Sequence, residues 1–223
     1  MIGVQFVQVG GGSQDLSSVA VLDDSMAGFD EDGNYATIME VWNGNGYDTY
    51  GWSGTSAGVY MDDETLNNKW LNLAYEEPDE ESKEGSGFWV KAEKAGTLTL
   101  SGEVPSEASI ATDLSSGYNI VANPYPGAVK ISDFGVLDST FAGFDEDGNY
   151  ATIMEVWNGN GYDTYGWSGT SAGVYMDDET LNNKWLNLSY EASEEEIGYG
   201  HAVWIKAAGS GKITFTSPAN AGN

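Results

Sequence analysis

Residues 38–52 read IMEVWNGNGYDTYGW, and the same letters return at residues 153–167. Apolar and polar side chains alternate on either side of the Asn-Gly-Asn-Gly stretch, which is the period-2 pattern typical of half-buried β-strands. Asn-Gly pairs adopt the positive φ angles that tight hairpin turns require. The stretch therefore predicts a β-hairpin in which Trp42 lies opposite Tyr47.

The hairpin belongs to a longer internal repeat. Residues 27–73 are identical to residues 142–188, an offset of 142 − 27 = 115. The offset persists outside this block, where residues 89–92 match residues 204–207. A chain of 223 residues is long enough for two domains of this size. We therefore predict a first β-repeat over 1–104, a structured connector over 105–116 and a second β-repeat over 117–223.

The start of the first copy differs from the start of the second. Residues 1–4 align best with residues 119–122, which requires a three-residue gap relative to the offset of 115. This alignment predicts that the chain begins inside the first strand of its first repeat. It also predicts that the natural protein continues upstream.

Short strand patterns separated by turn residues extend along the chain, whereas helical periodicity is weak and best near residues 15–19. Residues 62–68 fit a helical turn or an irregular excursion. The further strands predicted in the first copy cover residues 4–9, 58–61, 70–73, 88–92 and 97–100. Many short strands in each copy predict an all-β fold of two tandem homologous domains that resemble β-sandwiches or jelly rolls.

Residues 117–126 read GYNIVANPYP and resemble the GWNLIGNPYP opening of β-domains in large secreted and surface proteins of the Bacteroidetes and related bacteria. The later motifs of those domains, vWnG…Y.TY, GqGFWVKa and GtLtF, have counterparts at residues 156–165, 200–207 and 211–215. The first copy departs from the pattern at Val4-Gln5-Phe6, where the family has Asn-Pro-Tyr-Pro. The resemblance implies export and a non-enzymatic structural or accessory role, and it brings no catalytic residues.

The charge balance excludes several classes of partner. The chain has 35 Asp and Glu against 8 Lys and Arg, a formal net charge of −27. Phosphate backbones and anionic lipid surfaces repel such a protein, so nucleic-acid binding is not expected. No apolar run approaches the roughly 20 residues that a membrane-spanning helix needs, so membrane insertion is not expected either.

Residues for catalysis are not assignable from the sequence. The single histidine, His201, has Ser86 as its counterpart, so a Ser-His-Asp triad would exist in one copy only. The absence of cysteine leaves neither a thiolate metal site nor a cysteine nucleophile. Carboxylates are so abundant that no particular pair is specific for glycoside hydrolysis. We therefore predict that the chain is not an enzyme.

The acidic loop at residues 30–34, which recurs at residues 145–149, suggests a calcium site. Ca²⁺ takes six to eight oxygen ligands, and alternating carboxylates on a turn can point inward together. The EF-hand pattern is not met, because its twelfth position would be Met39 instead of glutamate. The alternative is a surface hairpin turn, because Asp-Gly is a strong turn pair. The candidate metal ligands are Asp30, Asp32, Asn34, Asp145, Asp147 and Asn149.

The repeated aromatic residues suggest a carbohydrate-binding surface, because flat exposed rings stack on sugar faces. The alternative is core or inter-repeat packing, since the core of a small sandwich needs large side chains. Trp52, Trp70 and their counterparts have glycine or polar neighbours, which makes them the better candidates for exposure. The candidate glycan-binding residues are Trp52, Trp70, Trp167 and Trp185.

These observations together favour an exported bacterial structural or adhesive β-repeat protein located outside the cell or on its surface. Its expected partners are glycans or proteins of a cell surface or matrix. A carbohydrate-binding module is the first alternative, and a calcium-stabilised surface module is the second. The sequence does not determine the oligomeric state.

Overall fold

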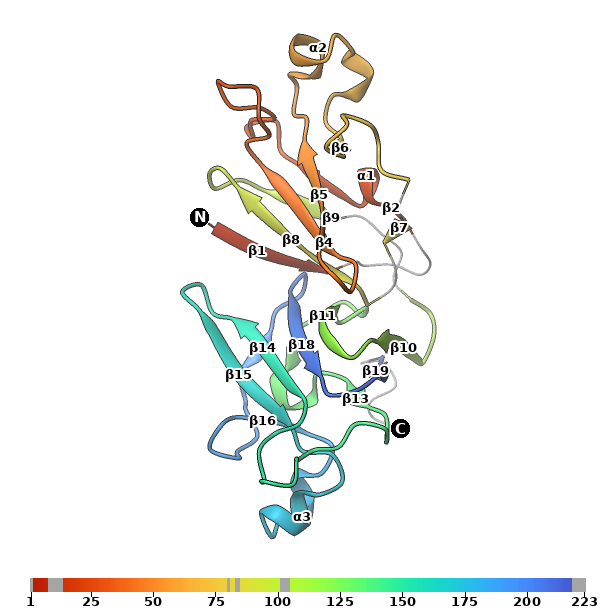
Figure 1. Ribbon diagram of the computed structural model, residues 1–223, viewed down its shortest axis with the longest axis vertical. Coiled ribbons are helices and arrows are strands. Elements are labelled where there is room, and N and C mark those ends of the chain that lie inside the picture. Colours follow the sequence, from red (N-terminus) through yellow and green to blue (C-terminus); the bar gives the residue numbers. More distant parts are fainter. Residues whose placement is uncertain (1, 8–13, 80, 83–84, 101–104, 218–223) are drawn as a thin grey trace.

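The computed structural model describes residues 2–7, 14–79, 81–82, 85–100 and 105–217. This part of the chain forms antiparallel β-sheets joined by turns and short helical segments (Figure 1). The all-β prediction is confirmed. No helix among the described residues has the length and apolar character needed to cross a membrane.

The first copy contains a five-stranded sheet in the order β1-β8-β4-β5-β6, together with the pairs β3-β9 and β2-β7. Its elements are β1 (Ile2–Val7), β2 (Gln14–Asp15), α1 (Leu16–Val19), β3 (Ala20–Leu22), β4 (Ile38–Trp42), β5 (Tyr47–Trp52), α2 (Ala57–Tyr60), η1 (Glu64–Leu66), β6 (Trp70–Leu71), β7 (Glu81–Ser82), β8 (Gly87–Ala92) and β9 (Leu98–Leu100). The helical segment expected near residues 15–19 is thus present as α1.

The second copy repeats the large sheet in the equivalent order β11-β18-β14-β15-β16, beside a three-stranded sheet β10-β19-β13 and the pair β12-β17. Its elements are β10 (Ser109–Leu114), β11 (Gly117–Ala122), β12 (Val129–Lys130), η2 (Ile131–Asp133), β13 (Val136–Leu137), β14 (Ile153–Trp157), β15 (Tyr162–Trp167), α3 (Ala172–Tyr175), η3 (Glu179–Leu181), β16 (Trp185–Leu186), β17 (Glu196–Ile197), β18 (Ala202–Ala207) and β19 (Gly211–Thr216).

The predicted hairpin forms as β4 and β5, and Trp42 lies opposite Tyr47. The loop between the strands is closed by Asn43, whose backbone N–H donates to the Gly46 carbonyl at 3.1 Å. The Asn43 side-chain oxygen also accepts the N–H groups of Asn45 and Gly46. Side-chain hydrogen bonds of this kind explain why asparagine and glycine dominate such turns.

Each copy buries its core between its large sheet and its smaller one. In the first copy, Met39 and Tyr50 of the large sheet share a buried cluster with Leu22 of β3. In the second copy, Met154 of the large sheet packs in one cluster with Ile213 of β19. Both copies are therefore two-layered, as aligned β-sandwiches are.

The pairing of the first strand corrects the alignment of the two starts. Ile2 of β1 pairs with Ala92, and Gly117 of β11 pairs with Ala207. Because 117 − 2 and 207 − 92 both equal 115, the repeat offset continues through the first strand without a gap. The sequence alignment placed residues 1–4 wrongly because β1 and β11 occupy equivalent positions in the two sheets but have different side chains.

Two further segments refine the sequence prediction. Residues 58–61 were predicted as a strand, but residues 58–60 belong to the helical turn α2, and Met61 caps it by donating its N–H to the Ala57 carbonyl at 2.7 Å. An alternation over four residues is too short to distinguish the two structures. The predicted connector contributes β10 (Ser109–Leu114), which pairs with β19 of the second copy. The domain boundaries themselves stay a prediction.

The two large sheets meet at the middle of the molecule. Ala122 N–H donates to the Gly85 carbonyl at 2.9 Å, and Ser86 forms an isolated bridge with Val121. A small apolar cluster in the second copy includes Ile120 and Trp204, and tryptophans of the first copy pack against it. The copies are therefore stacked along the long axis, with α2 at one end and α3 at the other (Figure 1).

Candidate functional site

The tryptophans predicted as glycan contacts lie inside the two cores. Trp52 and Trp70 are fully buried and pair across β5 and β6 with ring centroids 5.3 Å apart. Trp167 and Trp185 repeat this pair at the same distance in the second copy. The expectation that they are exposed is wrong, because large rings fill the space between the two sheets of each copy. A buried ring cannot stack on a sugar.

The acidic loops are closed by their own hydrogen bonds. Oδ1 of Asp30 accepts the backbone N–H groups of Asp32 at 3.0 Å and Asn34 at 2.8 Å. These backbone donors, chiefly that of Asn34, hold the pKa of the Asp30 carboxyl below its ordinary value. The same bonds recur in the second copy at Asp145, Asp147 and Asn149. The turn interpretation is thus confirmed.

Calcium binding by these loops stays a prediction. Among the described residues, no group of three or more His, Cys, Asp or Glu side chains is placed to hold a metal ion. The Asp30 carbonyl oxygen, a further potential ligand, accepts a hydrogen bond from the Tyr60 hydroxyl at 3.3 Å. The loop oxygens therefore already stabilise the loop itself.

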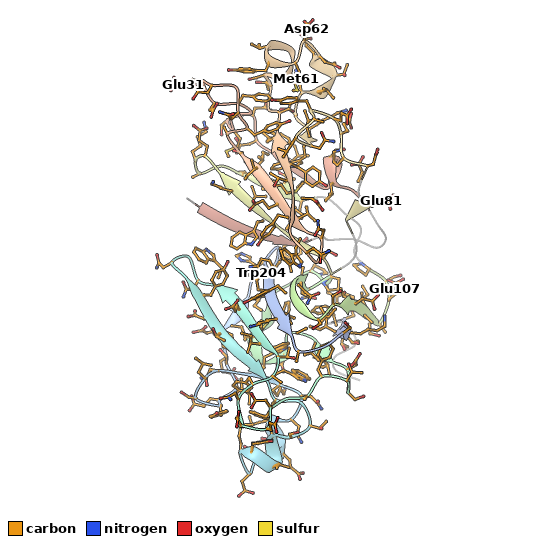
Figure 2. All side chains as sticks on the ribbon, in the orientation of Figure 1. Glu31, Met61, Asp62, Glu81, Glu107 and Trp204 are labelled. Atoms are coloured by element: carbon orange, nitrogen blue, oxygen red, sulfur yellow. The ribbon has the colours of Figure 1, made fainter. Side chains whose placement is uncertain are left out.

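An accessible aromatic surface lies instead at the outer end of each copy. In the first copy the Phe29 ring centroid lies 4.7 Å from that of Tyr60 and 6.5 Å from that of Tyr75. These rings line a groove of about 360 Å³, which we call the tip groove. The other residues lining it are Gly33, Met61, Asp63 and Leu66. Figure 2 shows Met61 and its neighbour Asp62 at this end of the molecule.

The second copy carries every residue of the tip groove at the offset of 115. The ring of Phe144 lies 4.6 Å from Tyr175 and 6.3 Å from Tyr190, which reproduces the first copy closely. The remaining counterparts are Gly148, Met176, Asp178 and Leu181. The molecule therefore has the same aromatic arrangement at both ends.

The groove tyrosines reach solvent. The exposed fraction is 48% for Tyr60 and 45% for Tyr75, and the adjoining Val59 is 82% exposed. At the groove edge, a hydrogen bond from the Thr65 hydroxyl lowers the pKa of Asp63, so this carboxylate is ionised at neutral pH. Each end thus combines exposed rings with a hydrogen-bond acceptor.

Tyr75 adopts a backbone conformation that is unusual for a bulky residue. Its φ angle is 65°, and that of Tyr190 is also 65°. A left-handed conformation costs roughly 1–2 kcal/mol for a residue with a Cβ atom. The loop accepts this strain because Asn72 N–H bonds the Glu76 carbonyl at 2.8 Å and the Tyr75 ring packs 5.7 Å from Tyr35. Strain retained in both copies marks the loop as a functional candidate.

A second aromatic surface lies where the copies meet, and we call it the junction pocket. The ring of Trp204 is 5.8 Å from Trp42, 6.2 Å from Tyr47 and 5.7 Å from Tyr118. These residues, with Glu155 and Tyr162, line a hollow of about 250 Å³. Trp204 lies between the two halves of the molecule in Figure 2.

The junction contacts are reciprocal. Trp42 of the first copy packs on Trp204 of the second at 79°, and Trp157 of the second packs on Trp89 of the first at 75°. Because 157 − 42 and 204 − 89 both equal 115, these are the same contact made twice. An isologous contact of this kind is what a twofold axis produces. The two copies therefore face each other in a pseudo-twofold arrangement.

Partial burial raises the pKa values of two tyrosines at this junction. Desolvation raises the pKa of Tyr47, with a smaller contribution from the Glu40 carboxylate. Desolvation also raises the pKa of the counterpart Tyr162. The indole nitrogen of Trp42 is buried and has no hydrogen-bond partner in the described part of the chain. Tyr47 and Tyr162 keep exposed fractions of 43% and 41%, so the junction is only partly desolvated.

Sequence reasoning missed the two surfaces in different ways. Trp42, Tyr47 and Tyr60 belong to the aromatic residues that recur in both copies, but the sequence predicted exposure for Trp52, Trp70 and their counterparts instead. Tyr75 was not singled out, although its recurrence as Tyr190 beyond the identical block is visible in the sequence. Comparison with protein-family models, with curated proteins and with solved structures finds no match for this chain.

Proposed function

We propose that the chain is an exported, non-catalytic adhesive module of a bacterial surface that binds carbohydrate through its two tip grooves. The observation that carries the proposal is the recurrence at both ends of the molecule of the solvent-accessible aromatic residues that line the tip groove of the first copy. Glycan binding, first considered for the buried tryptophans, is thereby assigned to Tyr60, Tyr75 and their counterparts Tyr175 and Tyr190.

The chemistry of the groove supports a carbohydrate ligand. A sugar ring presents C–H groups that pack on a flat aromatic face and hydroxyls that need hydrogen-bond partners. Tyr60 and Tyr75 supply exposed ring faces, and the ionised Asp63 supplies acceptor oxygens. The rings are held in place by Phe29 beneath them, so binding does not have to order them first.

The position of the grooves supports an adhesive role. They lie at opposite ends of a molecule whose halves are packed through aromatic contacts, so one chain can bridge two glycans. Two weak sites on one body give avidity without any further contact. The resemblance to secreted and surface β-domains and the net charge of −27 support an exported location.

A glycan array followed by calorimetry tests the proposal. We expect a polysaccharide or glycan to bind the chain, and we expect binding to be lost in the quadruple variant Tyr60→Ala, Tyr75→Ala, Tyr175→Ala and Tyr190→Ala. Tyr199→Ala, which removes a tyrosine of similar exposure outside both grooves, should leave binding unchanged. A lack of response to a broad glycan panel, or equal binding by the quadruple variant, would overturn the proposal.

A further inference from the structure

We propose that the junction pocket binds a quaternary ammonium group, through an aromatic cage that only the contact between the two copies completes. The inference is independent of the tip grooves, because no residue that lines a tip groove also lines the junction pocket.

The rings have the arrangement of a cage. The planes of Trp42, Tyr47 and Tyr118 stand at 79°, 84° and 83° to the plane of Trp204, with all centroids within 6.2 Å of it. Trp204 is 7% exposed and is the most buried of these four rings, whereas Tyr47 and Tyr118 are partly open to solvent. A cation that enters the hollow from solvent would therefore lie beside several aromatic rings at once.

The lining selects a particular kind of cation. Aromatic faces attract positive charge through the ring quadrupole but accept few conventional hydrogen bonds. A primary ammonium would lose its hydration in such a pocket without adequate replacement, whereas methyl groups on nitrogen need no hydrogen bonds and pack on the rings. Glu155 lines the same hollow, and its carboxylate supplies the opposite charge. The surrounding net charge of −27 attracts cations over a longer range.

One ring of the pocket already has a cation beside it. The ammonium group of Lys206 lies 5.7 Å from the centroid of the Tyr118 ring. Lys206 is exposed and opposite Tyr118 in the strand pairing, so it can turn toward solvent when a ligand arrives. It therefore acts as a competing cation, and its removal should strengthen ligand binding.

The pseudo-twofold axis supplies an internal control. The counterparts of Trp42, Trp204 and Glu155 are Trp157, Trp89 and Glu40, so most of the cage has an equivalent on the other side. The counterpart of Tyr118 in the strand register is Gly3, which has no ring. The complete cage is therefore expected only on the side of the pseudo-twofold axis that contains Tyr118.

Titration of the full chain with choline, followed by tryptophan fluorescence and calorimetry, tests the inference. We expect choline to bind about tenfold more tightly than ethanolamine, which carries a primary ammonium. Tyr118→Gly, which copies the first repeat, should weaken choline binding by about tenfold, since it removes one wall of the cage. Glu155→Gln should weaken it by about threefold and the matched variant Glu40→Gln by less than about twofold. Lys206→Gln should strengthen it.

Circular dichroism of each variant shows that it remains folded. Equal affinities for choline and ethanolamine, or an unchanged affinity in folded Tyr118→Gly, would overturn the inference. A trimethyllysine peptide and phosphatidylcholine vesicles identify the source of the group, and tighter binding of either than of choline supports the cage. The quadruple tyrosine variant of the tips should still bind choline, so failure of the two proposals is distinguishable.

Discussion

The tip grooves and the junction pocket are both lined by aromatic rings, yet they arise from the duplication in opposite ways. The tip groove takes all its residues from one copy, so the same residues and ring contacts recur in the other copy. The junction pocket takes Trp42 from one copy and Trp204 from the other, and Tyr118 has Gly3 as its counterpart. Duplication thus repeats a surface that lies within a copy and creates a new, single surface where the copies meet.

The largest effect is expected at the junction. Trp204→Ala should lower the free energy of unfolding by about 3–5 kcal/mol, because it leaves a cavity among rings of both copies. Tyr60→Ala at the tip should cost about 1 kcal/mol, since its ring is half exposed. Urea unfolding followed by fluorescence measures both. If the two variants were equally stable, the junction would not be a packed interface.

A glycine beneath the first tip groove should be nearly as sensitive. A Cβ atom on Gly28 would lie 1.9 Å from the Ser53 carbonyl oxygen, and one on Gly143 would lie 2.0 Å from that of Ser168. Gly28→Ala should therefore cost about 3 kcal/mol, because one backbone segment must move away from another. Gly46→Ala, where an added methyl group meets nothing within 4 Å, is the control in the same copy.

The Gly28→Ala variant also tests whether the tip groove and the junction pocket bind their ligands independently. Gly28→Ala should halve the number of glycan sites per chain and leave choline binding intact. A chain that kept both glycan sites would show that the contact between Gly28 and Ser53 does not support the groove.

Strain at the tip should be measurable by comparing two substitutions of one residue. Tyr75→Ala loses the ring but keeps the penalty of a positive φ angle, whereas Tyr75→Gly loses both. The glycine variant should therefore be more stable than the alanine variant by about 1 kcal/mol. Thermal unfolding gives the difference. A more stable alanine variant would mean that the loop has relaxed out of the left-handed conformation.

The two regions should also respond to opposite ends of the pH scale. At the tips the Asp30 and Asp145 carboxyls have lowered pKa values, so the stability they contribute is present above about pH 4 and is lost as the pH falls below it. At the junction the raised pKa values of Tyr47 and Tyr162 act in the other direction. Their contribution is present below about pH 10 and is lost as the pH rises further.

Unfolding midpoints measured from acid to alkaline pH test this contrast. Asp30→Asn combined with Asp145→Asn should flatten the acid limb alone, and Tyr47→Phe with Tyr162→Phe should flatten the alkaline limb alone. Changes that appeared on the wrong limb would contradict the assignment of these groups.

The smallest effect is expected from calcium. A cation site saturated at 100 times its dissociation constant would add about 2.7 kcal/mol to the free energy of unfolding. Because Oδ1 of Asp30 already accepts two backbone hydrogen bonds, we expect the melting temperature to be the same in Ca²⁺ and in chelator. A rise in Ca²⁺ that Asp30→Asn abolished would establish the acidic loop as a metal site.

The sequence predicted the elements that depend on neighbouring residues. The hairpin of residues 38–52 forms with Trp42 opposite Tyr47, and the Asp30 loop forms a turn. The sequence-based prediction failed where the burial of a side chain depends on residues far away in the chain. Trp70 looked accessible beside polar neighbours, but its indole N–H bonds the Ala20 carbonyl at 2.7 Å inside the core. That contact joins residues separated by fifty positions, which no local pattern contains.

The amino-acid sequence by itself determined that the chain is all-β, that it is duplicated, and where its tight turns lie. These properties follow from the alternation of side chains and from the φ angles that Gly, Asn and Asp tolerate, both of which are local. Only the tertiary structure decided which rings are buried, which form the tip grooves, and which meet at the junction. Burial is a property of the space between sheets, and that space exists only after distant strands have paired.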